Sequence, residues 1–125
     1  MNTGKNGFVR LIKSFGYAFK GIYDLLRLEP NSRIHLLATV CALIAGILLR
    51  ISRSEWCIIL IVIALVWAAE AFNTAFEKLT DHLFPEYNEK ARFAKDVAAG
   101  AVLVCAMAAL VCGLIIFLPK LMSVI

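Results

Sequence analysis

The chain has 125 residues, of which 62% are hydrophobic, and its mean hydropathy is +0.83. This apolar share is well above that of an ordinary soluble domain, so the composition excludes such a domain and predicts a protein that lies in a bilayer. The formal net charge is +4, with most of the excess in the first third of the chain, which favours anionic lipid head groups. No basic stripe interleaved with aromatic residues indicates nucleic acid.

The first predicted element is an amphipathic helix over residues 7–28, which follows a short polar tail over residues 1–6. Apolar residues recur every three or four positions from Phe8 to Ile22, and charged residues such as Lys13 occupy the other side. This helix is too charged to span a bilayer, so we expect it to lie in the membrane interface. A soluble amphipathic helix would show the same pattern, but the segments that follow favour the membrane.

Three apolar segments follow, and each is predicted to be a transmembrane helix. They cover residues 32–50, 55–80 and 96–118, and a mixed-charge loop over residues 81–92 separates the last two. Small residues make the third segment slim, which is typical of close helix packing. We therefore expect one all-α membrane domain over residues 1–125, with an N-terminal amphipathic surface helix and three transmembrane helices.

Local signals set the ends of these helices. Pro30 disfavours helical backbone at the residue before it, so the surface helix should end there. Asn31 or Ser32 is expected to cap the first span, and Ser54 resembles the start of the second. Pro119 is expected to end the third span.

The cysteines and histidines carry no metal-binding pattern. All four cysteines lie in or beside apolar segments without C-x-x-C spacing, so we interpret them as small hydrophobic side chains. His35 and His82 form no cluster, and each is expected at a helix end or at the membrane interface. The N-terminus lacks a short apolar core followed by a small-residue cleavage site, so no cleavable signal peptide is predicted.

The distribution of basic residues predicts the orientation. Ten of the thirteen Lys and Arg residues lie before or at the start of the first span, or from the last turn of the second span to the start of the third. These two regions share one side in a three-span protein, and the positive-inside rule places that side in the cytoplasm. We therefore expect a multi-pass protein with a cytoplasmic N-terminus.

The second span carries polar groups at its inner end. Glu70, Asn73 and Glu77 fall at i, i+3 and i+7, so a helix projects all three from one face. Glu70 directly follows an uncharged run over residues 56–69. An acid at membrane depth costs about 2.5 kcal/mol or more, so a functional role is its default interpretation.

These groups suit phosphoryl transfer from ATP and magnesium to a lipid alcohol on the cytoplasmic side. Magnesium prefers oxygen ligands, and Glu29 and Glu77 offer carboxylates. Glu70 is placed to accept the proton of a lipid hydroxyl, and partial desolvation would make it a better base. Lys95 could pair with a phosphate, while Asp96 could orient Lys95 or a metal-bound water.

Residue spacing alone leaves other interpretations open. No G-x-x-x-x-G-K-[ST] motif is present, and no strand precedes a Gly-rich turn. A small oligomeric proton-coupled transporter would also place a glutamate in a helix, and a scaffold subunit could bind another membrane protein through this polar face. Glu77 could also form a solvated ion pair with Lys78 or Lys95.

Two motifs are more specific. The pattern E-x-x-N-T-A-x-E over residues 70–77 and the pattern A-K-D-x-x-A-G-A-V over residues 94–102 resemble the prokaryotic diacylglycerol kinase family, which includes the undecaprenol kinases. The resemblance covers nearly the whole chain. It implies a small homotrimeric lipid kinase of the bacterial inner membrane, with active sites shared between neighbouring subunits, ATP as phosphate donor and Mg²⁺ as cofactor.

The resemblance also assigns roles to individual residues. Glu70 matches the general base, while Glu29 and Glu77 match metal and phosphate ligands. The nucleotide site that it implies contains Arg10, Tyr17, Glu29, Asn73, Glu77, Glu86, Tyr87, Lys95 and Asp96. The lipid site that it implies contains Glu70, Arg33 and Ala99. Asn88 departs from the histidine that the family often has beside the nucleotide-side loop.

Parts of the chain resemble the two branches of the family to different degrees. Residues 33–38 and 113–120 look more like the undecaprenol kinase branch of the family. The surface helix and the Glu86–Tyr87 pair look as much like the diacylglycerol branch. We expect undecaprenol as the acceptor, with diacylglycerol, which would give phosphatidic acid, as the alternative.

Overall fold

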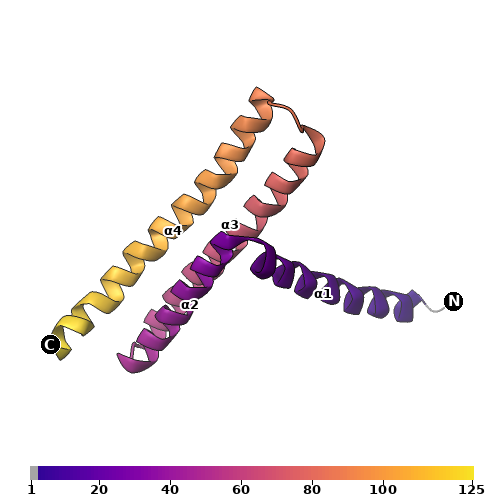
Figure 1. Ribbon diagram of the computed structural model, residues 1–125. Helices are drawn as coiled ribbons and strands as arrows, with labels where there is room; N and C mark the ends of the chain where they lie inside the picture. Colours follow the sequence, from indigo (N-terminus) through magenta and orange to yellow (C-terminus); the bar gives the residue numbers. More distant parts are fainter. Residues whose placement is uncertain (1–2) are drawn as a thin grey trace.

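The computed structural model describes residues 3–125, and within them the protein is built from four helices and contains no strand (Figure 1). α3 and α4 form a long hairpin, α2 lies beside the half of α3 that holds its N-terminus, and α1 projects away from the other three helices. The four helices are α1 (Thr3–Leu28), α2 (Pro30–Leu48), α3 (Arg53–Leu83) and α4 (Glu89–Val124).

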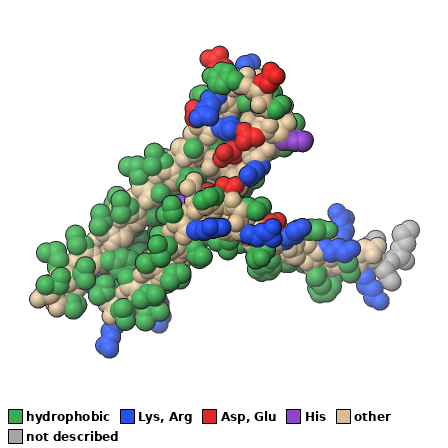
Figure 2. Space-filling view, in the orientation of Figure 1, with side chains coloured by type: hydrophobic (Ala, Val, Ile, Leu, Met, Phe, Trp, Pro, Cys, Tyr) green, Lys and Arg blue, Asp and Glu red, His purple; other side chains and the backbone are tan. Residues whose placement is uncertain are grey.

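The expected membrane architecture is confirmed. α2, α3 and α4 are each long and apolar enough to cross a bilayer, with mean hydropathies of 1.5, 2.1 and 3.0 over their most apolar windows. Hydrophobic side chains cover most of the visible surface of these helices, whereas charged side chains gather along α1 and around the α3–α4 turn (Figure 2). A hydrophobic outer surface of this kind suits contact with lipid.

α1 is amphipathic as predicted, but it is longer than expected. It begins at Thr3 rather than at residue 7, so most of the expected polar tail is helical. Residues 1 and 2 of that tail lie outside the described residues. Basic side chains follow one side of α1 and hydrophobic side chains another (Figure 2), which is the pattern of an interfacial helix.

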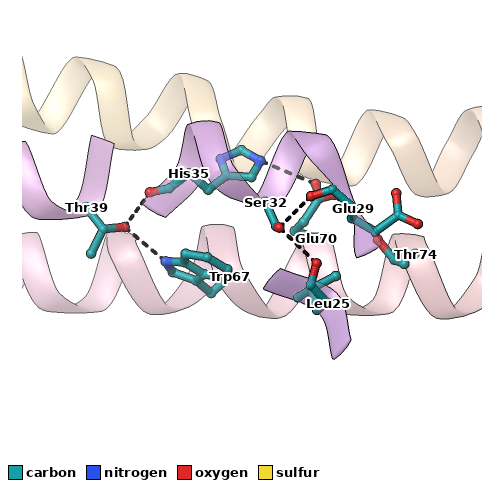
Figure 3. Close-up of polar contacts among 8 residues, drawn as sticks. All are labelled: Leu25, Glu29, Ser32, His35, Thr39, Trp67, Glu70 and Thr74. Atoms are coloured by element: carbon teal, nitrogen blue, oxygen red, sulfur yellow. Dashed lines mark hydrogen bonds and ion pairs between the residues drawn. The ribbon is translucent and has the colours of Figure 1, made fainter. Parts of the chain in front are cut away.

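Ser32 ties the end of α1 to the start of α2 instead of capping α2. Its hydroxyl is fully buried and lies 2.9 Å from the carbonyl oxygen of Leu25 and 2.6 Å from that of Glu29, so it can donate to either (Figure 3). Glu29 is the N-cap residue and makes no capping side-chain bond. Pro30 follows at the first helical position, where its missing N–H costs nothing. The expectation that Asn31 or Ser32 caps α2 is therefore wrong.

The turn between α2 and α3 is closed by Ser52, two residues before the expected Ser54. The Ser52 hydroxyl accepts a bond from the Glu55 N–H (3.2 Å), and Glu55 Oε1 accepts one from the Ser52 N–H (2.8 Å). This reciprocal pair is a capping box. Sequence reasoning chose the wrong serine because two serines precede Trp56 in this segment.

The loop between α3 and α4 is shorter than predicted, and α4 is longer. α3 runs to Leu83 and α4 begins at Glu89, so only residues 84–88 of the expected 81–92 loop are non-helical. α4 also continues through Pro119 to Val124, so the expectation that Pro119 ends this helix is wrong. An internal proline removes one backbone hydrogen bond. The turn beyond it is tied to α3 by an ion pair between Lys120 and Glu55 (3.2 Å).

Candidate active site

Glu70 lies in the apolar part of α3 and is only 3% exposed. Its carboxylate has two polar neighbours: His35 on α2, with Nε2 3.3 Å from Oε2, and Thr74 one turn along α3, whose hydroxyl lies 3.4 Å from Oε1. Figure 3 shows the His35 ring directed toward Glu70 from the neighbouring helix. Because an unpartnered carboxylate is costly at this burial, these contacts keep an acid in an otherwise apolar helix.

A pocket of about 250 Å³ opens beside this carboxylate. All three apolar helices contribute side chains to it, and its polar lining comes from two amides, one imidazole and one carboxylate. The lining residues are Asn31, Ile34, His35, Glu70, Asn73, Ala99 and Val102. The structure thus brings Glu70 and Asn73 of the first motif together with Ala99 of the second in the lining of one pocket.

Glu29 and Glu77 occupy different surroundings. Glu29 Oε1 lies 3.3 Å from Nζ of Lys78, and the Glu29 side chain is 20% exposed. Glu77, the neighbour of Lys78 in the chain, is exposed and enters no ion pair between residues 3 and 125. The alternative in which Glu77 pairs with Lys78 or Lys95 is therefore wrong.

Lys95 lies at the loop end of the hairpin. Its Nζ is 2.6 Å from Oδ1 of Asp81 on α3, and both residues line a second pocket of about 190 Å³ under the 84–88 loop. Glu86 and Tyr87 line the same pocket, so three of the predicted nucleotide-site residues meet there. Asp96 instead pairs with Arg92 one turn earlier on α4 (3.4 Å), and the expectation that it orients Lys95 is wrong for the single chain.

Like Glu29, Glu77 and Asp96, three further predicted site residues line neither pocket. Arg10 and Tyr17 are exposed on α1, which points away from the other helices (Figure 1). Arg33 is exposed at the start of α2, where Nη2 donates a hydrogen bond of 3.1 Å to the Arg27 carbonyl oxygen. A single protomer therefore does not bring them to Glu70.

The carboxylates suit magnesium by their chemistry but do not form a complete ligand set. Within residues 3–125, no three His, Cys, Asp or Glu side chains lie close enough together to hold a metal ion. Magnesium in phosphoryl-transfer sites is commonly bound by one or two carboxylates, with phosphate oxygens and water completing its octahedron. Glu29 and Glu77 could supply that number of carboxylates, but Glu29 is paired with Lys78 and Glu77 is exposed in different surroundings.

No site role was predicted from the sequence for His35, Asn31 or Asp81, although His35 lies within residues 33–38, one of the segments that resemble the family. Each of the three lines a pocket. His35 lies in the second turn of α2, close to the helix end where it was expected, and its side chain is 18% exposed and faces Glu70. Helical spacing could have found Thr74 at i+4 from Glu70, but no spacing rule relates residues on different helices.

The four cysteines are free, as their interpretation as small hydrophobic side chains requires. Cys41 and Cys57 are exposed on the apolar helices, and Cys105 and Cys112 are half-buried on α4. None of them lines the pocket beside Glu70 or the pocket under the loop. The chemistry of the site therefore rests on oxygen and nitrogen groups.

Comparison with known proteins identifies relatives of this chain that are lipid kinases. The profile of the prokaryotic diacylglycerol kinase family matches residues 16–117. The chain is 41% identical to an undecaprenol kinase of Bacillus subtilis over 117 residues, which cover 94% of this chain and 95% of that protein. It is 37% identical to a diacylglycerol kinase of Synechocystis over 90% of this chain and 65% of the relative, and 29% identical to one of Escherichia coli over 89% and 91%.

The matched region runs from the second half of α1 to the residues just before Pro119, so it includes every polar residue that lines the two pockets. Both motifs that carried the resemblance lie inside it. With the membrane helices, the buried carboxylate and these matches in hand, the chain belongs to the prokaryotic diacylglycerol kinase family and is a lipid kinase.

Proposed function

We propose that this protein transfers the γ-phosphoryl group of ATP, with Mg²⁺, to the terminal hydroxyl of undecaprenol. The observation that carries the proposal is the buried Glu70 carboxylate beside the 250 Å³ pocket, within a membrane helix. A carboxylate in this position can accept the proton of a lipid alcohol whose hydrocarbon chain remains in the bilayer. Phosphoryl transfer asks little more of a protein than this base, positioning and charge neutralisation.

In the proposed reaction, the lipid hydroxyl enters the pocket and Glu70 accepts its proton. The hydroxyl oxygen bonds to the γ-phosphorus as the bond from that phosphorus to the bridging oxygen of ATP breaks, and ADP leaves. The products are the lipid monophosphate, ADP and the proton held on Glu70, which is later released to water. Asn73, half-buried in the same pocket, can donate its amide N–H groups to a phosphate oxygen.

The nucleotide would lie toward the loop end of the hairpin. Lys95 is the cation best placed to neutralise phosphate there, because its side chain is only 23% exposed and lines the pocket with Glu86 and Tyr87. Its present partner Asp81 is 56% exposed, so exchanging this ion pair for a phosphate costs little. Glu29 and Glu77 would hold Mg²⁺, which supplies charge neutralisation on the phosphates when bound.

Two observations support undecaprenol as the acceptor: an apolar groove and the sequence identity to known lipid kinases. An apolar groove of about 630 Å³ runs between α2, α3 and α4, and His35 lines both this groove and the Glu70 pocket. A long hydrocarbon chain could therefore follow the groove while its hydroxyl reaches Glu70. The identity is 41% to the undecaprenol kinase and 37% and 29% to the two diacylglycerol kinases, which favours undecaprenol over diacylglycerol.

We also propose a homotrimer in the bacterial inner membrane, with the N-terminus in the cytoplasm. Arg10, Tyr17 and Asp96 do not reach the Glu70 pocket from within one protomer. A neighbouring subunit that brings its α1 and α4 to this pocket would complete the site. The basic residues of α1 and of the α3–α4 turn support the cytoplasmic placement of both.

The test is a phosphate-transfer assay with radiolabelled ATP that offers undecaprenol and diacylglycerol side by side, with and without Mg²⁺. We expect Mg²⁺-dependent labelling, a higher kcat/KM for undecaprenol, and a loss of kcat of about 10²–10⁴-fold in Glu70→Gln. The variant should remain folded in detergent because glutamine keeps the shape of the side chain. Undiminished turnover by Glu70→Gln would remove Glu70 as the base, and a preference for diacylglycerol would reassign the acceptor.

A further inference from the structure

His35 is the only charged or chargeable residue of the described chain within ion-pair distance of Glu70. The distance from Nε2 to Oε2 is 3.3 Å, and the two side chains are 18% and 4% exposed (Figure 3). Water therefore has little access to this contact, and the geometry of the carboxylate depends on its protein partners. On the α4 side of the pocket the lining residues are Ala99 and Val102, which offer no competing charge.

His35 is itself held from two directions. The Thr39 hydroxyl donates to the His35 carbonyl oxygen (2.7 Å), and the indole N–H of Trp67 donates to that hydroxyl (2.9 Å). The Trp67 ring also meets the His35 ring edge-on, with ring centres 6.2 Å apart. The bond from Trp67 to Thr39 joins α3 to α2 one turn away from Glu70 and so ties the two helices together (Figure 3), while the Trp67 ring packs against the imidazole.

The two oxygens of Glu70 are not equivalent in this arrangement. Oε2 faces the His35 nitrogen, whereas Oε1 is approached only by the Thr74 hydroxyl at a longer 3.4 Å. A neutral imidazole with its proton on Nε2 would donate to Oε2. Oε1 would then keep lone pairs free for a second hydrogen-bond donor, such as a substrate hydroxyl in the pocket.

Building on the function proposed above, we propose that His35 is a positioning residue for the general base. Its Nε2–H bond holds the Glu70 carboxylate in one rotamer and directs Oε1 toward the incoming lipid hydroxyl. His35 acts through Glu70 and does not contact the nucleotide. A misplacement of about 1 Å at a reacting group costs about 10²-fold in rate, which sets the scale of the expected effect.

The first test compares two substitutions at the same position. His35→Leu removes the donor and keeps a comparable volume, so we expect kcat to fall about 10- to 100-fold with KM for ATP unchanged. His35→Gln places an amide N–H near the position of Nε2, and it should restore kcat to within about threefold of wild type. Both variants lack the imidazole ring, so a role limited to packing against Trp67 would lower both equally and would overturn the inference.

His82 provides a matched control, because it is the other histidine of the chain and lies exposed near the end of α3. It enters no hydrogen bond or ion pair within the described residues and lines neither polar pocket. His82→Leu should therefore leave kcat unchanged. A fall in the His82→Leu variant equal to that in His35→Leu would show a general effect of losing a histidine and would contradict the inference.

Repeating the His35 substitution in a Glu70→Asp variant separates the positioning role of His35 from the proposed function. Glu70→Asp shortens the base by one methylene, so its carboxylate no longer reaches His35, and adding His35→Leu should lower kcat less than twofold further. A full additional loss would mean that His35 acts independently of Glu70. Wild-type-like turnover by His35→Leu would overturn only the positioning role, whereas wild-type-like turnover by Glu70→Gln would overturn the proposed base.

Discussion

The two ends of the α3–α4 hairpin are built for different tasks. At the end that carries the 84–88 loop, polar groups line a pocket and Lys95 meets a carboxylate that is 56% exposed. At the opposite end, Ile51, Ile59 and Ile116 are 6%, 2% and 5% exposed and form the hydrophobic core that Trp56 packs against. Glu70 lies between the two ends, where it is buried in α3 and also lines a pocket.

The difference shows where the protein can accept new partners. At the core end, Ser52 and Glu55 cap each other and Glu55 also pairs with Lys120, so these polar groups are already engaged within the protein. The loop end keeps its ions in exposed pairs, which contribute little to stability and exchange readily for a ligand. Substitutions at the core end should therefore change folding, and substitutions at the loop end should change turnover.

Ile59→Ala should give the largest change in stability. Ile59 is 2% exposed between Ile51 and Ile116, so truncation leaves a cavity. Leu, Ile or Met to Ala in a core costs about 2–5 kcal/mol, and we expect the lower part of that range because lipid solvates apolar groups as well as a core does. Reversible unfolding in mixed detergent micelles would measure the loss. If kcat per folded molecule also fell, the core end would affect turnover as well as folding, which would contradict the difference between the two ends.

Lys95→Met should lower activity and spare stability. A hydrogen bond to a charged group contributes about 1.5–3 kcal/mol, so kcat/KM for ATP should fall about 10- to 100-fold. The ion pair to Asp81 is partly solvated, so its loss should change the free energy of unfolding by at most about 1 kcal/mol. ATP-dependence assays and unfolding curves on the same preparation would measure both. Asp81→Asn removes the same ion pair and leaves Lys95, so an equal loss of kcat/KM in that variant would contradict the phosphate role.

Gly46→Ala should lower stability less than Ile59→Ala does. A Cβ atom at Gly46 would lie 2.7 Å and 2.8 Å from two ring atoms of Trp56, so the indole must move. Overpacking of this kind costs about 1–3 kcal/mol. We expect a lower melting temperature in detergent with normal kcat, and recovery of that temperature when Trp56→Phe is added to make room. An unchanged melting temperature for Gly46→Ala would show that the core end is less tightly packed than the distances imply.

Much of the fold follows from local patterns. The apolar runs and the amphipathic start predicted one surface helix and three membrane helices, and all four are present. The errors fall at helix ends: Ser52 rather than Ser54 caps α3, and α4 passes through Pro119. Ends depend on competing caps and on contacts such as Lys120 with Glu55, and these contacts come from another helix.

In the candidate site, too, some features follow from local spacing and others depend on neighbouring helices. The spacing of Glu70 and Asn73 predicted a shared face, and both line one pocket. Glu77, on the same predicted face, lies nearer the loop end of α3 and is exposed there. Helical spacing sets direction around an axis, but it does not say which neighbour covers each turn.

The sequence by itself determined the class of protein, the number and order of its helices, and the family to which its motifs belong, because hydrophobicity and spacing act along one chain segment at a time. Only the tertiary structure decided that His35 faces Glu70, that Glu29 meets Lys78 and that Lys95 meets Asp81. Each of these pairs joins residues that are 14 or more positions apart. Such contacts depend on how helices are rotated and shifted against one another, and packing between whole helices sets that register.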